Sequence, residues 1–334
     1  DLAPVPAGVP ATRLTGVAGG EVDLRWRWAD LDFIPSARIE AMQDGISRRA
    51  AGGVPVAGLP AVFRWSPILR AGLVRPVVDR PALKVALKAN AGRYVRVPSF
   101  IELYGNGTAM VLGNDDLVPE HGTNADVGVW IDGGGEHVGI VSRTTGFAAE
   151  VDDLIRWQYA SWGQARADNL ARARIFGAEQ ELRLVLGRHV GLVGQATYLD
   201  ARDRSAIVAA YDNQLPFHAR YRGYLRPQLA HVALPAGLEL GAYADAELRM
   251  HDYADPANLV DLGTRLLLGC GVTLAWPRGR LRATASAVNL TGTQREDVDN
   301  WSLPGRAVFF TVAYAPIGGD AGPGAAIFDP RYGQ

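Results

Sequence analysis

The sequence is poor in the residues that form disulfides and metal sites. Cys270 is the only cysteine among 334 residues, so neither a disulfide within the chain nor a cysteine metal site can form. The six histidines are scattered, and no two have the spacing of metal ligands on a helix. No G-x-S-x-G motif and no glycine-rich dinucleotide fingerprint occurs. We therefore expect no catalytic group, no metal site and no cofactor.

Lysine and long apolar runs are also scarce. Only Lys84 and Lys88 occur, so arginine carries nearly all of the positive charge. The formal net charge of -1 is close to balanced, which speaks against nucleic acid as a partner. No run of about eighteen apolar residues exists, which excludes a transmembrane helix but not membrane strands of about ten residues. The hydrophobic content of 48% still provides a large apolar surface.

Alternation with a period of two is the strongest pattern that the sequence contains. In residues 237–251, Glu239, Asp245 and Glu247 alternate with leucines and alanines, which gives a strand one polar and one apolar face. Similar patterns bring the number of predicted strands to about thirteen, the others lying at about 21–28, 36–42, 62–75, 82–93, 124–132, 137–148, 173–187, 190–200, 217–232, 261–276, 280–290 and 305–315. Residues 1–20, rich in proline and glycine, are predicted to be loop, and the polar segment 150–171 a short helix or loop.

The connections between the predicted strands alternate in length. Short connections lie at 187–189, 234–236 and 277–279, and long ones at 201–216, 252–260 and 291–304. The apolar rows are long and rich in alanine, and they end in aromatic residues at Trp28, Trp276 and Tyr314. Short turns, long loops and aromatic girdles are typical of an antiparallel transmembrane β-barrel, whereas a soluble β-sandwich has shorter strands. The predicted fold class is therefore all-β.

The longest connection, residues 93–128, contains a series of motifs in a fixed order. They are Pro98-Ser99-Phe100, Glu102-Leu103-Tyr104-Gly105, Gly113-Asn114, Leu117, Pro119-Glu120 and Gly128. This order resembles the mid-barrel signature of TonB-dependent outer-membrane receptors, although Asp126 stands where glutamate is commoner. Segments 169–179, 215–220 and 289–306 are similar to later parts of the same family pattern. We expect the motifs of 93–128 to shape the connection rather than to select a cargo.

The resemblance covers about residues 90–315 and implies an integral outer-membrane protein. It implies about thirteen strands of a presumed 22-stranded barrel, with short periplasmic turns, long extracellular loops, and the plug and first strands absent. The expected division is an extracellular loop remnant at 1–20, barrel at 21–315 and a Gly/Pro-rich tail at 316–334. The implied function is TonB-energised uptake of a scarce nutrient: ferric siderophore, haem, cobalamin or oligosaccharide. Because this function involves no covalent chemistry, the resemblance implies that the protein is not an enzyme. The implied partners are the TonB complex through a plug, the missing N-terminal barrel part, outer-membrane lipid and the nutrient ligand.

Two sets of side chains are the candidate functional residues. Aromatic residues in the predicted extracellular loops suit capture of a bulky ligand: Tyr104, Trp157, Tyr159, Trp162, Tyr211, Tyr253 and Trp301. Charged residues on the polar strand faces are expected to face the lumen and the plug: Arg25, Lys84, Lys88, Glu239, Asp245, Glu247, Arg280 and Arg282. Two other functions are compatible with the sequence. One is a passive or structural outer-membrane barrel such as a porin or adhesin, and the other is a soluble β-rich binding module or hydrolase.

Overall fold

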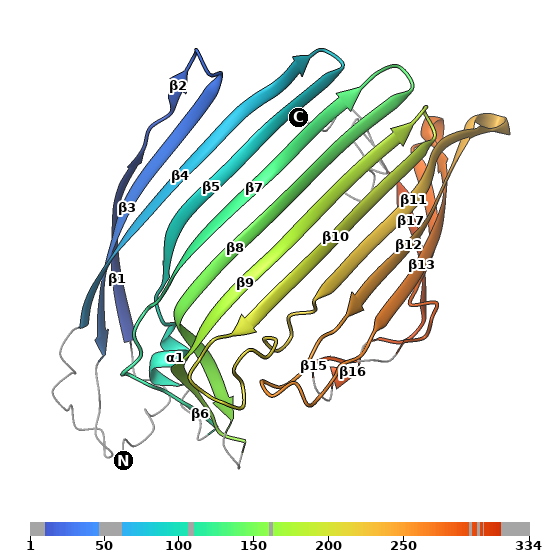
Figure 1. The fold of residues 1–334 in the computed structure, drawn as a ribbon. Helices are drawn as coiled ribbons and strands as arrows, with labels where there is room; N and C mark the ends of the chain where they lie inside the picture. Colours follow the sequence, from blue (N-terminus) through green and yellow to red (C-terminus); the bar gives the residue numbers. More distant parts are fainter. Residues whose placement is uncertain are drawn as a thin grey trace.

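The protein folds into one large antiparallel sheet (Figure 1). The computed structural model describes residues 11–46, 62–105, 110–159, 163–293, 296–298, 301–302 and 304–314. Within these ranges, thirteen strands follow one another in chain order: β1 (Ala11–Glu21), β3 (Leu31–Ile46), β4 (Val62–Arg80), β5 (Leu83–Arg96), β7 (Glu120–Gly134), β8 (Val138–Tyr159), β9 (Ala165–Leu186), β10 (Val190–Asp203), β11 (Tyr221–Leu234), β12 (Leu238–Met250), β13 (Arg265–Trp276), β14 (Leu281–Val288) and β17 (Ala307–Tyr314). The predicted all-β class and the predicted number of strands are confirmed.

Small elements complete the fold. The short strand β2 (Leu24–Trp26) pairs with β3, β6 (Val111–Leu112) pairs in parallel with β9, and β15 (Glu296–Val298) pairs with β16 (Trp301–Ser302). One helix, α1 (Phe100–Tyr104), and two 3-10 turns, η1 (Pro235–Gly237) and η2 (Pro277–Gly279), are present in the described ranges. None of the helices among the described residues has the length and apolarity needed to cross a membrane.

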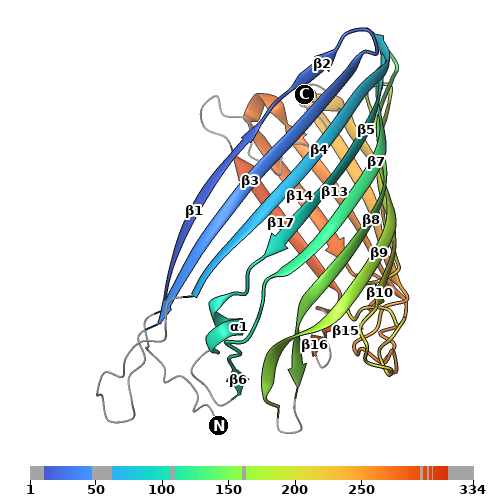
Figure 2. The same cartoon turned by 60° about the vertical axis from the view of Figure 1, so that its left-hand side comes forward.

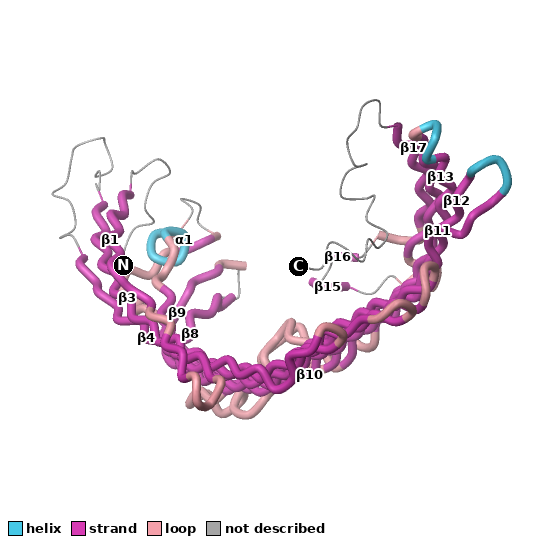
Figure 3. Tube along the Cα trace, turned by 90° about the horizontal axis from the view of Figure 1, so that it is seen from above, coloured by secondary structure: helices cyan, strands magenta, loops and turns pink. Residues whose placement is uncertain are grey.

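The sheet curves into an open trough (Figure 3). Among the described strands, β1 pairs only with β3 and β17 pairs only with β14, so both edges of the main sheet are open. The helix α1 lies inside the curve, and we call this side the concave face and the other side the convex face. Because successive side chains of a strand point to opposite faces, the strand register assigns each strand residue to one of the two faces.

The connections at the two ends of the sheet differ in length (Figures 1 and 2). At one end, which we call the turn end, strands are joined by tight turns at 81–82, 135–137, 187–189, 235–237 and 277–279. At the other, the loop end, the connections span 97–119, 204–220, 251–264 and 289–306. The predicted alternation of short and long connections is confirmed, and it is typical of a transmembrane barrel.

The convex face is apolar and about as tall as a bilayer. On β13 the convex row is Leu266, Leu268, Cys270, Val272 and Leu274, as the sequence predicts. The 14 residues of β11, at ~3.3 Å each and a tilt of ~45°, span roughly 30 Å, which matches the hydrocarbon thickness.

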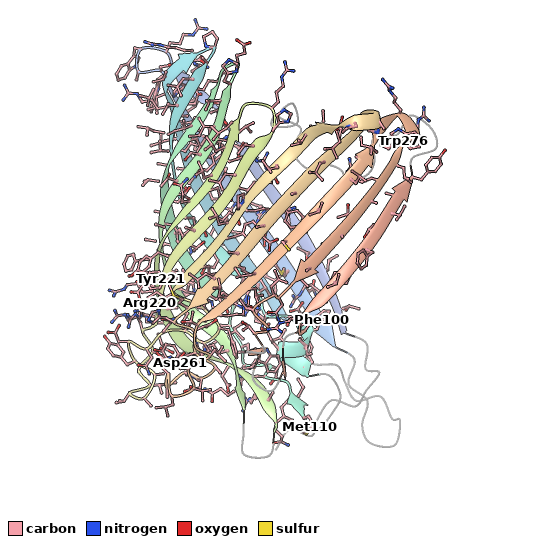
Figure 4. The ribbon with its side chains drawn as sticks, turned by 90° about the vertical axis from the view of Figure 1, so that its right-hand side faces the viewer. Phe100, Met110, Arg220, Tyr221, Asp261 and Trp276 are labelled. Atoms are coloured by element: carbon pink, nitrogen blue, oxygen red, sulfur yellow. The ribbon has the colours of Figure 1, made fainter. Side chains whose placement is uncertain are left out.

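Aromatic side chains border this apolar band at both ends. Trp276 and Tyr314 lie at the turn end, and the rings of Tyr198 and Tyr221 lie 5.4 Å apart at the loop end (Figure 4). Trp28 lies in the turn after β2 and is 89% exposed. An apolar band bordered by aromatic residues is typical of transmembrane β-barrels.

A few polar residues interrupt the convex face, and they bond to one another. The register places Ser142, Thr144 and Gln180 on this face. The Thr144 hydroxyl donates to the Gln180 carbonyl, and the Gln180 amide donates to the Ser142 hydroxyl at 2.9 Å. Because these groups satisfy each other, they can face an apolar environment at a reduced desolvation cost.

Two predicted segments differ from the structure. Residues 11–20 were expected to be loop but belong to β1, which pairs with β3 from Ala11–Ile46 to Glu21–Ser36. This strand forms through backbone pairing with β3. Its glycines and small residues give little alternation of apolar and polar side chains, so the sequence pattern does not reveal it. The expected strand at 21–28 is correspondingly wrong, since β1 ends at Glu21 and β2 covers only Leu24–Trp26.

The segment 150–171 was expected to be helix or loop but is mostly strand. β8 continues to Tyr159 and β9 begins at Ala165. A β-bulge shifts the register of this pair between Val151 and Leu154, and Asp153 adopts a φ of 56°. A bulge moves the following side chains to the other face, so the period of two is broken at this point and the sequence pattern fails. The predicted tail at 316–334 lies outside the described residues.

Candidate functional site at the loop end

The motif-rich connection 97–119 folds back against the loop end of the sheet (Figure 2). Its helix α1 starts with a capping box, in which the Ser99 hydroxyl accepts the Glu102 N–H and the Glu102 carboxylate accepts the Ser99 N–H at 2.7 Å. The helix stops at Gly105, whose φ is 73° and where a Cβ would lie 2.4 Å from the Val111 carbonyl oxygen. A glycine is therefore required at this position.

Arg96 holds two buried carboxylates together beside this helix. Its guanidinium donates to Glu120 at 2.6 and 2.7 Å and to Glu102 at 3.1 Å. Glu120 also accepts the backbone N–H of Ile155 at 2.7 Å. Burial alone would raise the pKa of Glu102, but the hydrogen bonds from Ser99 and Arg96 outweigh burial and lower that pKa below its ordinary value.

A small apolar core completes this substructure. Leu103, Leu117, Ile155 and Ala167 form a buried cluster, against which Tyr104 and Trp157 pack. The side-chain amide of Asn114 donates to the Ala167 carbonyl at 2.9 Å and to the Asp168 carboxylate at 2.7 Å. We call residues 97–119, together with the strand ends that they contact, the loop platform.

Asp44 connects the first strands to the loop platform. This carboxylate is buried and is bound by Arg13 at 2.6 Å and by Arg64 at 3.2 Å. Arg13 also donates to the Pro98 carbonyl at 2.9 Å and lies over the Phe100 ring. The sequence analysis missed these residues, because a polar residue on a predicted strand carries no sign of the distant partners that it will meet.

The predicted ligand-binding aromatic residues do not converge on one site. Tyr104 and Trp157 pack against the platform core, whereas Tyr211 is 54% exposed and Tyr253 forms an isolated bridge with Asp261. Trp162 and the side chains of Tyr159 and Trp301 lie outside the described residues. The structure thus brings together two of the described aromatic residues, and both pack inward. Ligand contact by any residue of the set stays a prediction.

Seven of the eight charged residues predicted to face the lumen lie on the concave face. The register places Lys84, Lys88, Glu239, Asp245, Glu247 and Arg282 there, and Arg25 lies opposite Asp32 of the same face. Arg280 instead follows η2 in a turn, with a φ of 54°. It was expected on a strand face, but the strand begins at Leu281, one residue later than the alternation indicates. Contact with a plug stays a prediction for all eight residues.

A cavity of about 770 Å³ lies at the loop end, between the β10–β11 connection and the ends of β7–β9. Its lining includes Tyr211, His121, Asp152, Arg172 and Arg204. The arginine charges are paired, since Arg172 binds Asp152 at 2.6 Å and Arg204 binds Asp212 at 2.9 Å. The register places His121 on the convex face, so this cavity does not open only toward the lumen.

A second cavity, of about 440 Å³, lies over β10–β13 near the loop end. Its concave-face lining consists of polar and charged side chains: Gln195, Thr197, Arg222, Tyr224, Glu247, Arg249 and Arg265. Arg222 lies opposite Arg249, and Arg249 lies opposite Arg265, so three arginines form one row across three adjacent strands. We call these three residues the arginine row. The sequence analysis did not find it, because the row exists only in the register.

The described residues contain no group of three or more His, Cys, Asp or Glu side chains suited to a metal ion. The family model described as "TonB dependent receptor-like, beta-barrel" matches residues 15–309. No curated protein matches the sequence.

Solved structures share the fold. The copper transporter OprC is 17% identical with a TM-score of 0.70, over 90% of this chain and 47% of its own. The siderophore receptor PiuA from Acinetobacter baumannii is 14% identical with a TM-score of 0.70, over 90% and 43%. The ferric yersiniabactin uptake receptor FyuA from Yersinia pestis is 16% identical with a TM-score of 0.62, over 91% and 44%. The chain thus spans less than half the length of each of these proteins.

Proposed function

The chain belongs to the TonB-dependent receptor β-barrel family, and we propose that it forms part of an outer-membrane receptor for energised uptake of a scarce nutrient. The observation that carries this proposal is the two-faced trough: an apolar convex face of bilayer height and a polar, charged concave face. A soluble β-rich module would bury an apolar face, whereas here large apolar side chains such as Phe310, 81% exposed, point outward. Receptors rather than enzymes make up the family, which agrees with a transport role.

The proposed partners follow from the surfaces that the described strands leave uncovered. The open edges of β1 and β17 carry unpaired backbone groups, which favours further strands that close the barrel within lipid. The charged concave face suits a plug held by ion pairs and hydrogen bonds, and the convex face suits outer-membrane lipid. The TonB complex would act on the plug rather than on this chain.

The proposed cargo is a large nutrient captured from the loop end: a ferric siderophore, haem, cobalamin or an oligosaccharide. Three similar structures are described as a copper transporter, a ferric yersiniabactin uptake receptor and a siderophore receptor, and those descriptions apply to those proteins. Their similarity supports uptake in general. It does not identify the cargo, because identities of 14–17% indicate a shared fold and not a shared pocket chemistry.

Growth of a strain that lacks the gene tests the proposal. The deletion strain is grown with each candidate iron, cobalamin or sugar source as the limiting nutrient, with and without a functional TonB. We expect a defect on one source, restored by the intact gene only when TonB is active. Uptake that continues without TonB would instead support a passive barrel such as a porin.

A further inference from the structure

The arginine row of Arg222, Arg249 and Arg265 is an unfavourable arrangement on its own. Each adjacent pair lies directly opposite in an antiparallel register, where like charges repel. Chain connectivity does not impose this arrangement, since a neutral residue at any of the three positions would relieve the repulsion. A row of this kind is explained if an anionic group occupies the space above it.

The acidic groups of the described chain offset the row only in part. Arg265 pairs with Glu247, and Arg249 lies 3.6 Å from Asp252. Arg222 makes no hydrogen bond or ion pair with any described residue, and it acts on Asp252 only through its electrostatic field. Burial raises the pKa of Asp252 above its ordinary value, although Arg249 and Arg222 act against that rise. Of the three guanidinium groups, that of Arg222 thus keeps its positive charge without a hydrogen-bonded carboxylate among the described residues.

Neutral hydrogen-bond donors surround the exposed guanidinium. The Gln195 amide, the Thr197 hydroxyl and the Tyr224 phenol line the same cavity of about 440 Å³. No hydrogen bond of these three side chains to another described residue is present. The cavity therefore offers converging donors in a volume typical of small-ligand sites.

The loops that connect the strands of this cavity are bonded to one another. The Gln214 side chain donates to the carbonyls of His218 and His251, both at 2.6 Å, and so joins the β10–β11 and β12–β13 connections. The Asn258 amide donates to the Gln214 carbonyl at 2.9 Å. Donors on strands whose connections are interlocked are preorganised, which reduces the cost of ordering them around a ligand.

We propose that the arginine row and its neutral donors bind a small oxyanionic ligand, one that presents carboxylate or phosphate groups to Arg222. This inference rests on the proposed uptake function and narrows the cargo to an anion. Guanidinium groups pair with carboxylate and phosphate through two parallel hydrogen bonds, and two neighbouring arginines can engage one polyanion. A neutral oligosaccharide would leave the positive charge of the row unmatched.

Binding to outer membranes of cells that produce the intact protein tests this assignment. The probes are citrate for carboxylates, pyrophosphate for phosphates and maltotriose as a neutral control. The variants are Arg222→Gln, Arg222→Lys and the matched control Arg226→Gln. Arg226 lies on the same strand and face but outside the cavity, with its guanidinium 3.7 Å from the centre of the Tyr243 ring.

We expect citrate or pyrophosphate to bind more tightly than maltotriose, and more weakly as salt rises. Loss of one charge-assisted bond in Arg222→Gln should weaken the affinity for the anion about 10- to 100-fold. Arg222→Lys should recover part of it and Arg226→Gln should bind like the unmodified protein. Equal binding of all three probes, or an Arg222→Gln variant with unchanged affinity, overturns the proposal.

A plug contact at the same row would give a different result. In that case Arg222→Gln would leave anion affinity unchanged but open the barrel, measured as entry of vancomycin into the cells, and the proposal would be overturned. TonB-dependent growth measured in the same strains separates this failure from failure of the uptake function. If the unmodified protein binds none of the anions but growth still requires TonB, the anion site is excluded and the receptor function is supported.

Discussion

The loop platform and the arginine row lie at the same end of the trough, and both are built from arginines, yet their charges are arranged in opposite ways. In the platform, each guanidinium is matched: Arg96 joins Glu102 and Glu120, and Arg13 and Arg64 share Asp44. In the row, each guanidinium belongs to a residue that lies opposite another arginine, and Arg222 has no hydrogen-bonded partner among the described residues.

This difference indicates that the platform arginines stabilise the fold, whereas the row is suited to binding a ligand. A buried charge whose bonds are complete within the chain has nothing left to offer a ligand, and its loss costs folding free energy. An exposed guanidinium beside like charges contributes little to folding free energy, but it can form strong charge-assisted hydrogen bonds with a bound anion. We therefore expect substitutions in the platform to reduce stability and substitutions in the row to reduce ligand affinity.

The largest expected effect is on the platform, from Glu120→Ala. The change removes two bonds to Arg96 and leaves the buried N–H of Ile155 without its acceptor. Loss of a buried charged partner should cost about 3–5 kcal/mol of local stability. Hydrogen exchange at the Ile155 amide is the measurement, with Glu239→Ala as a control on the exposed part of the concave face. Unchanged protection of Ile155 would contradict the structural role of this carboxylate.

Asp44→Asn should have the next largest effect. It keeps the shape of the side chain but leaves Arg13 and Arg64 facing each other without a negative charge. A loss of about 2–4 kcal/mol is expected for the contacts between the first strands and the platform. The rate of protease cleavage within 97–119 measures this loss. The control is Asp32→Asn on the same strand, which affects only the pair of Asp32 with Arg25, and this variant should be cleaved as slowly as the unmodified protein.

Acid should loosen the platform through Glu102. Its pKa is lowered in the folded protein, so its contribution to stability is complete above the unfolded-state pKa and is lost as the pH falls through the lowered folded-state pKa. Hydrogen exchange of α1 followed down to that range should show the loss, and Glu102→Gln should show weaker protection at neutral pH with less dependence on pH. A Glu102→Gln variant that keeps the full acid response would assign the effect to another carboxyl group.

The smallest expected effect on stability is that of Arg222→Gln. Because the change removes a repelling charge and no hydrogen bond, its free energy of unfolding should stay within about 0.5 kcal/mol of the unmodified protein. Thermal unfolding of the intact protein in detergent, followed by circular dichroism, is the measurement. A loss of stability as large as that of Glu120→Ala would show that Arg222 has a structural role like that of the platform arginines.

The sequence predicted the parts of the site that are local. The run from Pro98 to Gly105 predicted a shaped connection, and the structure places it in a capped helix with a required glycine at its end. The same reasoning did not show that Tyr104, a predicted ligand contact, packs against Leu117 and Ile155, because those residues come from other segments. Asp44 and Arg96 were missed for the same reason, since ion pairs across strands leave no mark on either partner's surroundings in the sequence.

The sequence by itself determined most of the strands, their two faces and the order of short and long connections, because a period of two and the turn residues are local properties. It also determined the family, through motifs that shape one connection. The tertiary structure decided where β8 shifts its register at Asp153, which carboxylates meet Arg96, and that Arg222, Arg249 and Arg265 share one row. Those outcomes depend on pairing between distant residues, where a shift of one position would exchange the concave and convex faces.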